Sequence, residues 1–114
     1  MNVIFEKINP EAILPTKNYS SAGFDLFFPP KNGIYNIIYL KHGERFNFHL
    51  GFKCEFSSNY VALFFDRSGL GNKGLKCLAG VIDADYRGEW VFILVNTGLE
   101  EIAIDTRKAI GQVL

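Results

Sequence analysis

The chain has 114 residues, of which 12 are Lys or Arg and 12 are Asp or Glu, so its formal net charge at pH 7 is zero. A chain of this length is expected to form one domain, residues 1–114, which buries a core without metal ions or disulfide bonds. Because the charge is balanced, no broad electrostatic field attracts the protein to nucleic acid or to membrane headgroups. We therefore expect neither as a partner, and any polyanionic ligand must meet a local site.

The composition favours an all-β, intracellular protein. Eleven Phe, five Tyr and many Ile and Val stand against a single Met, which favours β structure. Cys54 and Cys77 lie in strand-like surroundings, which favours buried, reduced thiols over a secreted disulfide scaffold. The N-terminus lacks a signal-peptide pattern, and no segment approaches the ~20 apolar residues that span a bilayer. We expect a soluble cytoplasmic protein, in the host-cell cytoplasm if the chain is viral.

Short apolar runs separated by Gly, Pro, Asn and Ser follow one another along the chain. Such runs predict strands at residues 3–8, 24–28, 34–40, 45–48, 53–56, 60–65, 90–96, 102–104 and 109–114. Strands at this spacing predict a sandwich or barrel. The run 90–96, WVFILVN, is apolar on both alternating faces. It therefore needs cover from two sides, in the centre of a small sandwich or at a subunit interface.

The stretch DRSGLGNKG, residues 66–74, contains Gly69, Gly71 and Gly74 at the spacing of a dinucleotide-binding fingerprint. That fingerprint must run into a helix, because the helix N-terminus holds the pyrophosphate. The next residues, LKCLAGVIDADYRG, show no apolar spacing of three and four, so no helix is expected there. The phosphate loop of nucleoside triphosphatases is also excluded, since Leu75 and Lys76 stand where its Lys and Ser or Thr belong.

The stretch VIDADYRG admits two interpretations. Asp85 and Gly88 occupy the first and fourth positions preferred by a type I turn, so a turn is predicted at residues 85–88. In the structural interpretation this stretch only turns the chain, and Asp83 pairs with a basic residue. Taken alone, the stretch slightly favours that interpretation over a functional one.

Three separated loops together favour a functional site. Each loop offers polar groups at turns: Asp25 in SAGFDL, Arg67 and Ser68 in DRSGLGNKG, and Asp83 with an aromatic neighbour in GVIDADYRG. A carboxylate that activates water, a hydroxyl and cations for phosphates, and an aromatic face for a sugar or base describe a nucleotide phosphohydrolase site.

Four motifs follow one another along the chain: ILPTKNYSSAGFDL, RSGLGNKG, GVIDADYRGEWVFILVN and IGQVL. In these motifs and in their order the chain resembles the trimeric dUTPases, a family that hydrolyses dUTP to dUMP and pyrophosphate. The resemblance implies a distorted jelly-roll-like β-barrel or sandwich that assembles as a homotrimer, with active sites between subunits. It also implies dUTP as the small-molecule ligand and Mg²⁺ as the cofactor.

The resemblance further implies a role for each site residue. Asp83 would activate the attacking water, Tyr86 would pack beneath the deoxyribose and exclude a 2′-hydroxyl, and Asp25 would hold the magnesium shell through water. The phosphates would be contacted by Arg67, Ser68, Gly69 and Gln112. A hairpin around residues 77–82 would read the uracil edge through backbone groups of Cys77, Gly80, Val81 and Ile82.

The sequence also departs from the family's pattern. Asp66 replaces the usual Pro before Arg-Ser-Gly, and Cys77 stands where many relatives have Asn. Residues 107–109 replace the Gly-Asp-Arg that begins the fourth motif. The fifth motif, a Gly-rich C-terminal arm with an Arg and a Phe, has no counterpart before Leu114. Because closure of that arm excludes water, its absence is expected to lower turnover more than ground-state binding, unless Arg107 and Lys108 compensate.

Two classes of function follow. The first is a dUTP diphosphatase, favoured because the water-activating Asp83 is retained. The alternative is a nucleotide-binding protein on the same fold that sequesters, senses or regulates without efficient chemistry. A deoxycytidine nucleotide deaminase of related fold ranks third, because no matching constellation of acid and arginine is present.

Overall fold

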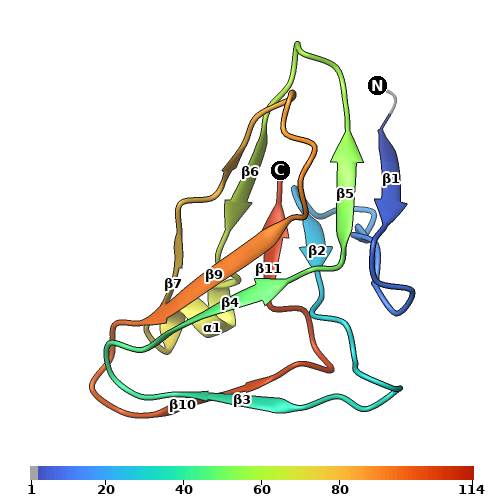
Figure 1. Cartoon of the computed structure of the whole chain (residues 1–114). Coiled ribbons are helices and arrows are strands. Elements are labelled where there is room, and N and C mark those ends of the chain that lie inside the picture. Colours follow the sequence, from blue (N-terminus) through green and yellow to red (C-terminus); the bar gives the residue numbers. More distant parts are fainter. Residues whose placement is uncertain (1–2) are drawn as a thin grey trace.

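The structure, a computed structural model, describes residues 3–114, and its regular secondary structure is almost entirely strand (Figure 1). Met1 and Asn2, which belong to the predicted domain and to the stretch compared with a signal peptide, lie outside the described residues. The elements in chain order are β1 (Ile4–Lys7), β2 (Phe24–Leu26), β3 (Ile37–Leu40), β4 (Arg45–His49), β5 (Phe52–Glu55), β6 (Ala62–Phe65), α1 (Ser68–Asn72), β7 (Leu75–Leu78), β8 (Val81–Ile82), β9 (Val91–Asn96), β10 (Ile102–Asp105) and β11 (Gly111–Val113).

Two larger sheets and two strand pairs make up the fold. One sheet has the order β2-β11-β6-β8 and the other the order β4-β9-β7, while β1 pairs with β5 and β3 with β10. The β3–β10 pair forms the lower edge of the molecule in Figure 1, and α1 lies near the lower ends of β6 and β7. The predicted all-β sandwich is confirmed, and within residues 3–114 the sheets do not close into a barrel.

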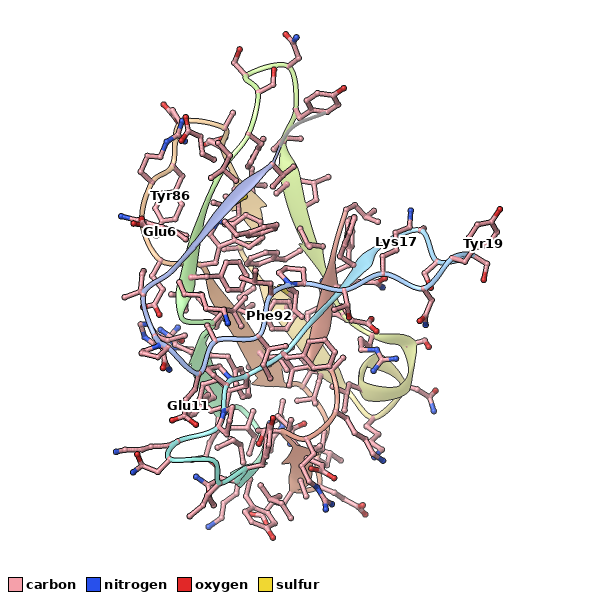
Figure 2. All side chains as sticks on the ribbon, turned by 90° about the vertical axis from the view of Figure 1, so that its right-hand side faces the viewer. Glu6, Glu11, Lys17, Tyr19, Tyr86 and Phe92 are labelled. Carbon is pink, nitrogen blue, oxygen red and sulfur yellow. The ribbon has the colours of Figure 1, made fainter. Side chains whose placement is uncertain are left out.

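Phe92 of β9 joins the two larger sheets at the centre of the side-chain core (Figure 2). Its ring centroid lies 5.5 Å from that of Phe64 on β6. A Cβ on Gly111 of β11 would lie only 2.2 Å from the Phe92 ring, so only glycine allows the ring to reach β11. Burial of a side chain of this kind contributes about 2–3 kcal/mol to folding, and this contact brings β11, with Gln112, against the rest of the core.

The two faces of β9 differ in burial. Alternate residues from Phe92 to Asn96 are buried, whereas those from Val91 to Val95 are only half-buried. The first face fills the core, as predicted for residues 90–96. The second face is still apolar and has no such cover within the described part of the chain.

Asn96 is a buried polar residue that ties β9 to the β3–β10 pair. Its side-chain nitrogen donates hydrogen bonds to Leu40 O at 2.9 Å and Glu100 O at 2.8 Å, and its side-chain oxygen accepts one from the amide of Gly98 at 2.9 Å. Each polar atom of the side chain is therefore satisfied, which removes most of the cost of burying an amide.

All nine predicted strands are present, with shifts at their ends, but three elements were not predicted. β7 and β8 lie in the glycine-flanked stretch after residue 74, where short length and turn residues hide the pattern. The helix α1 forms inside the loop that contains Gly69 and Gly71, although glycine disfavours helices. It is only five residues long, and its first turn is closed by the amide of Gly71 donating to Arg67 O at 2.8 Å. No helix among residues 3–114 is long and apolar enough to cross a membrane.

Candidate active site

Strand β11 brings Asp25 and the DRSGLGNKG loop together. Gln112 pairs with Asp25 on β2 and with Phe65 on β6. The loop begins immediately after Phe65, so its first residues, Asp66 and Arg67, emerge beside Gln112. Two motifs that are 40 residues apart in sequence thus meet because both flank the same central strand.

Side-chain contacts hold this cluster in place. The side-chain nitrogen of Gln112 donates to Asp66 O at 3.0 Å. Arg67 Nε lies 4.0 Å from Asp25 Oδ1, at the limit of an ion pair, and Arg67 Nη1 lies 3.5 Å from Ala109 O. The cluster therefore presents a guanidinium and an amide group beside a carboxylate.

Ser68 and Gly69 complete this end of the molecule. Both are exposed at the start of α1, and no atom lies within 4 Å of a Cβ placed on Gly69. The first amides of a helix precede its first internal hydrogen bond, so those of Ser68 and Gly69 have no partner within α1. A guanidinium, a hydroxyl and backbone amides at one exposed end can bind anionic oxygens. The structure thus brings together four predicted site residues, Asp25, Arg67, Ser68 and Gln112. We call these four residues the phosphate-side cluster.

Asp66, which stands where the family usually has Pro, does not face outward as a free charge. One carboxylate oxygen accepts a hydrogen bond from the amide of Cys77 on β7, and the other lies 3.3 Å from Lys76 Nζ. Only 23% of the Asp66 side chain is exposed. Its charge is thus directed toward the edge of β7.

Asp83 opens a turn at the other end of the β2-β11-β6-β8 sheet. The amide of Tyr86 donates to Asp83 O at 3.1 Å, so the turn spans residues 83–86 and the predicted turn at 85–88 is wrong. The peptide enters the turn directly from Ile82 at the end of β8, two residues earlier than the Asp–Gly spacing suggested. Among the described residues Asp83 is exposed and makes no ion pair. The structural interpretation, in which Asp83 pairs with a basic residue, is therefore not supported.

The Tyr86 ring is held in a defined orientation. Its hydroxyl donates to Glu89 O at 2.8 Å. A Cβ on Gly88 would lie 2.5 Å from the hydroxyl oxygen, so the ring packs directly over Gly88. The side chain lies at the side of the molecule in Figure 2, and one face of it remains accessible, since Tyr86 is 42% exposed. A fixed, accessible aromatic face suits stacking against a sugar.

The segment from Cys77 to Ile82 is not a paired hairpin. β7 pairs with β9, whereas β8 pairs with β6, so the two strands belong to different sheets. The Cys77 thiol is buried, and burial raises its pKa to about 11. The Cys77 amide already donates to Asp66. Neither the thiol nor the amide of Cys77 is therefore presented to a ligand.

Gly80, Val81 and Ile82 are placed differently from Cys77. Gly80 has a φ of 101°, and a Cβ there would lie 3.2 Å from Phe64 O, so only glycine is tolerated without strain. Its carbonyl accepts a hydrogen bond from the amide of Phe64 at 2.8 Å. Val81 is 61% exposed beside Asp83, while Ile82 packs partly against the core.

The two ends of the candidate site lie far apart within one chain. Asp83 follows Ile82, which pairs with Ala62, whereas Gln112 pairs with Phe65. From this register, Asp83 and Gln112 are about 13 Å apart along the direction of β6 and about 10 Å apart across the sheet, which is two strand spacings. The two components combine to a distance of roughly 16 Å. Figure 2 agrees, because Tyr86 lies on the side of the molecule opposite α1.

An apolar strip separates the two ends. Cross-strand partners share a face of a sheet and residues two apart share it too, which assigns Phe65, Leu63 and Val81 to the face that carries Gln112. Phe65 and Val81 are exposed large hydrophobic residues, as is Leu114, which exchanges backbone hydrogen bonds with Leu63. Sequence reasoning missed this strip. The sequence YVALFF does contain its signal, because Leu63 and Phe65, which alternate with the core-facing Ala62 and Phe64, are also apolar.

The side chains near Asp25 suit a divalent cation only together with a bound phosphate. No group of three or more His, Cys, Asp or Glu able to hold a metal ion occurs among residues 3–114. Mg²⁺, however, usually keeps several waters and is bound through one or two carboxylates together with substrate phosphates. The single carboxylate of Asp25, one-third exposed beside Arg67, fits that kind of binding and not an all-protein cage.

Comparisons with known proteins identify the family of the chain. A dUTPase family model matches residues 9–114. The chain is 36% identical over 118 residues to a deoxyuridine 5'-triphosphate nucleotidohydrolase of Clostridium novyi, which covers 100% of this chain and 79% of that protein.

Solved structures show the same fold. The native EIAV dUTPase has a TM-score of 0.81 at 21% identity, over 99% of this chain and 86% of that chain. A mutant dUTPase from phage phi11 of S. aureus, described as coordinating a structural Mg(II) ion, has a TM-score of 0.81 at 19% identity, over 100% and 89% of the two chains. These likenesses confirm a β-sandwich of the jelly-roll type. The family model and the relative from Clostridium novyi establish that the chain belongs to the dUTPase family.

Proposed function

We propose that the protein hydrolyses dUTP to dUMP and pyrophosphate, with Mg²⁺, at sites formed between the subunits of a homotrimer. Family membership and relatives named as deoxyuridine 5'-triphosphate nucleotidohydrolases support the reaction. The exposed carboxylate of Asp83 and the exposed cation and hydroxyl at the start of α1 support the chemistry.

The observation that carries the proposal is the separation of Asp83 from the phosphate-side cluster within one chain. A single nucleotide cannot be held by Arg67 and Gln112 while water is activated by an Asp83 roughly 16 Å away on the same subunit. The Asp83 end of one subunit must then meet the phosphate-side cluster of another. Such a contact is head-to-tail, and head-to-tail contacts that close produce rings. Three subunits fit the family, and the apolar strip of Phe65, Leu63 and Val81 offers surface for the contact.

Each residue has a specific role in this mechanism. Asp83 accepts a proton from the water that attacks the α-phosphorus while the bond from that phosphorus to the leaving pyrophosphate breaks, the task of a general base. Tyr86 supports the deoxyribose, and its ring, fixed by the hydrogen bond to Glu89 O, leaves no space for a 2′-hydroxyl. From the adjacent subunit, Arg67, Ser68 and Gln112 bind phosphate oxygens and orient the chain of phosphates for in-line attack.

Gln112 can serve two partners at once. One hydrogen of its amide nitrogen is directed to Asp66 O, and an amide NH₂ carries two donors. The second can reach a phosphate oxygen while the first keeps the side chain in position. The amides of Gly69 and its neighbours add donors at short range.

Asp25 is positioned to hold Mg²⁺ through water. When bound, the cation neutralises phosphate charge and aligns the phosphate oxygens. For base recognition, we propose that the backbone of residues 80–82, in which Val81 is exposed, contacts uracil, since the amide and thiol of Cys77 are engaged elsewhere. We also propose a cytoplasmic location, which the two free buried thiols, Cys54 and Cys77, support.

Complementation between variants tests this proposal. Asp83→Asn and Arg67→Ala are each purified as inactive proteins, mixed, unfolded and refolded together. If the site is shared, mixed assemblies contain some sites with Asp83 from one subunit and Arg67 from the next, so chromatography detects dUMP. The matched control mixes Asp83→Asn with the double variant Asp83→Asn/Arg67→Ala and stays inactive. Absence of recovered activity, in mixed assemblies demonstrated by mass spectrometry, would show that one chain holds the whole site.

A further inference from the structure

Asp66 connects three parts of the phosphate-side cluster. Its carboxylate accepts the amide hydrogen of Cys77 and lies 3.3 Å from Lys76 Nζ, both on β7. Its backbone carbonyl accepts the side-chain amide of Gln112 at 3.0 Å. We propose that Asp66 is a positioning residue, which anchors the start of the loop 66–74 to the edge of β7 and so presets Arg67, Ser68 and Gln112 for phosphate. This inference rests on the proposed function for its kinetic readout.

Cys77, at one end of this contact, is held in place by a sheet and by burial. Cys77 pairs with Leu94 in the ladder between β7 and β9, and both residues are buried. Its amide is used by Asp66, so it points away from β9 at the edge of the sheet. An ionised carboxylate bound to such an amide forms a charge-assisted hydrogen bond, which is shorter and stronger than a neutral one.

The other end of the contact is the backbone that carries the ligand groups. Asp66 directly precedes Arg67, whose carbonyl accepts the first hydrogen bond of α1, from Gly71 at 2.8 Å. A Cβ on Gly71 would lie 3.8 Å from Asp66 Cβ, so the helix also packs against this residue. With five residues and two glycines, α1 has little intrinsic stability. An external anchor is therefore the feature that orients its first turn.

The anchor is also compatible with an anionic substrate. A carboxylate beside polyphosphate would repel it, but here both oxygens are directed to β7 and one is paired with Lys76. Position, rather than charge, is then what the residue contributes. Four variants separate these two effects.

Glu11 is a matched control, because it performs the same structural task elsewhere. Its two carboxylate oxygens accept the amides of Asn32 at 2.7 Å and Gly33 at 2.8 Å. It thus clamps a loop through backbone amides as Asp66 does, and it lies on the side of the molecule away from α1 (Figure 2). Loss of this clamp should affect stability without affecting the phosphate-side cluster.

The experiment measures steady-state kinetics with dUTP and hydrogen exchange of the amides of residues 67–72. Asp66→Ala is expected to raise KM about tenfold, equivalent to about 1.4 kcal/mol, with kcat changed far less, because uniform phosphate binding is lost. Asp66→Glu keeps the charge but displaces the oxygen, so KM rises as well. Asp66→Asn keeps an acceptor at the same place but loses the charge, so its KM is expected to lie between that of the parent and that of Asp66→Ala. Glu11→Ala leaves KM unchanged.

Hydrogen exchange distinguishes failure of this inference from failure of the proposed function. Asp66→Ala and Asp66→Glu should increase exchange in residues 67–72, whereas Glu11→Ala should not. If the parent forms no dUMP, the proposed function is wrong and exchange alone decides the role of Asp66. An active parent with unchanged KM in both Asp66→Ala and Asp66→Glu would overturn the positioning role. So would unchanged exchange in these variants, or an equal rise of KM in Glu11→Ala.

Discussion

Gln112 and Asp25 lie directly opposite each other in the ladder between β11 and β2. The same Gln112 lies opposite Phe65 on the other side of β11, and its side chain bonds to Asp66 O. One residue of the central strand thus places the carboxylate expected to hold a cation beside the loop expected to bind phosphate. Strand register therefore sets the positions of Asp25 and Gln112, whereas Arg67 and Ser68 lie beyond the end of β6, in the loop that follows Asp66.

Asp83→Asn should abolish turnover and leave binding nearly intact. The substitution keeps the side-chain shape but removes the general base, whose contribution is about 10²–10⁴-fold in rate. We expect kcat for dUTP to fall by at least this factor, while calorimetry with a non-hydrolysable dUTP analogue shows affinity within a few-fold of the parent. Asp85→Asn is the control, since it removes an exposed carboxylate from the same turn. Parental kcat in Asp83→Asn would exclude the assigned role.

Tyr86→Ala should weaken discrimination against UTP. The ring is held over Gly88 and by the bond to Glu89 O, and we expect its removal to raise kcat/KM for UTP relative to dUTP about tenfold. Tyr86→Phe keeps the ring and loses only the hydroxyl, so its ratio should stay closer to the parent. Competing assays with both nucleotides measure the ratio. Unchanged discrimination in Tyr86→Ala would place the sugar elsewhere.

Asn96→Ala should strongly destabilise the fold. The change removes three hydrogen bonds and leaves the carbonyls of Leu40 and Glu100 without their donor. The expected loss is about 2–4 kcal/mol in the free energy of unfolding, measured by urea denaturation. Asn47→Ala on β4, where the side chain is exposed, should change it by less than about 0.5 kcal/mol. Equal effects of the two substitutions would contradict the stabilising role of the Asn96 hydrogen bonds.

Both thiols should resist modification in the folded protein. Burial raises the pKa of Cys54 and of Cys77 from 9.0 to about 11, and the thiolate is the reactive form. Since the folded pKa exceeds the unfolded one, the neutral thiols contribute stability below pH 9 that is lost as the pH rises toward 11. A thiol reagent at pH 8 should react slowly with the native protein and fully after denaturation. Rapid native labelling of either residue would contradict their burial.

Asp105 should titrate below the normal range of an aspartate. Hydrogen bonds from the Arg107 side chain and backbone lower its pKa from 3.8 to about 2, and the guanidinium lies 2.9 Å away. Because the folded pKa is depressed, the contribution of this pair is present above the unfolded pKa and is lost as the pH falls toward 2. NMR titration of the carboxyl carbon measures the pKa, which Arg107→Ala should return to near 4. The contact also shows that Arg107 is already engaged at the turn after β10.

Most strands could be predicted from the sequence, whereas the roles given to the site residues stay predictions. Period-two alternation and turn residues are local signals, so all nine expected strands are present. Three errors came from signals that are not local. β8 has only two residues and is stabilised by pairing with β6. The start of the turn at Asp83 depends on where β8 ends. The helix α1 forms in a glycine-rich sequence because Asp66 and β7 hold its first turn.

The sequence alone determined which residues are candidates for water activation, sugar stacking and phosphate binding, because Asp83, Tyr86 and Arg67 stand in motifs that are short and contiguous. Their distribution in space was decided only by the tertiary structure. Strand register unites Asp25, Arg67 and Gln112 at one end of a sheet and leaves Asp83 at the other. The physical reason is that pairing between distant strands, which sets this register, depends on which apolar faces meet in the core. A motif within a single segment therefore cannot predict the register between distant strands.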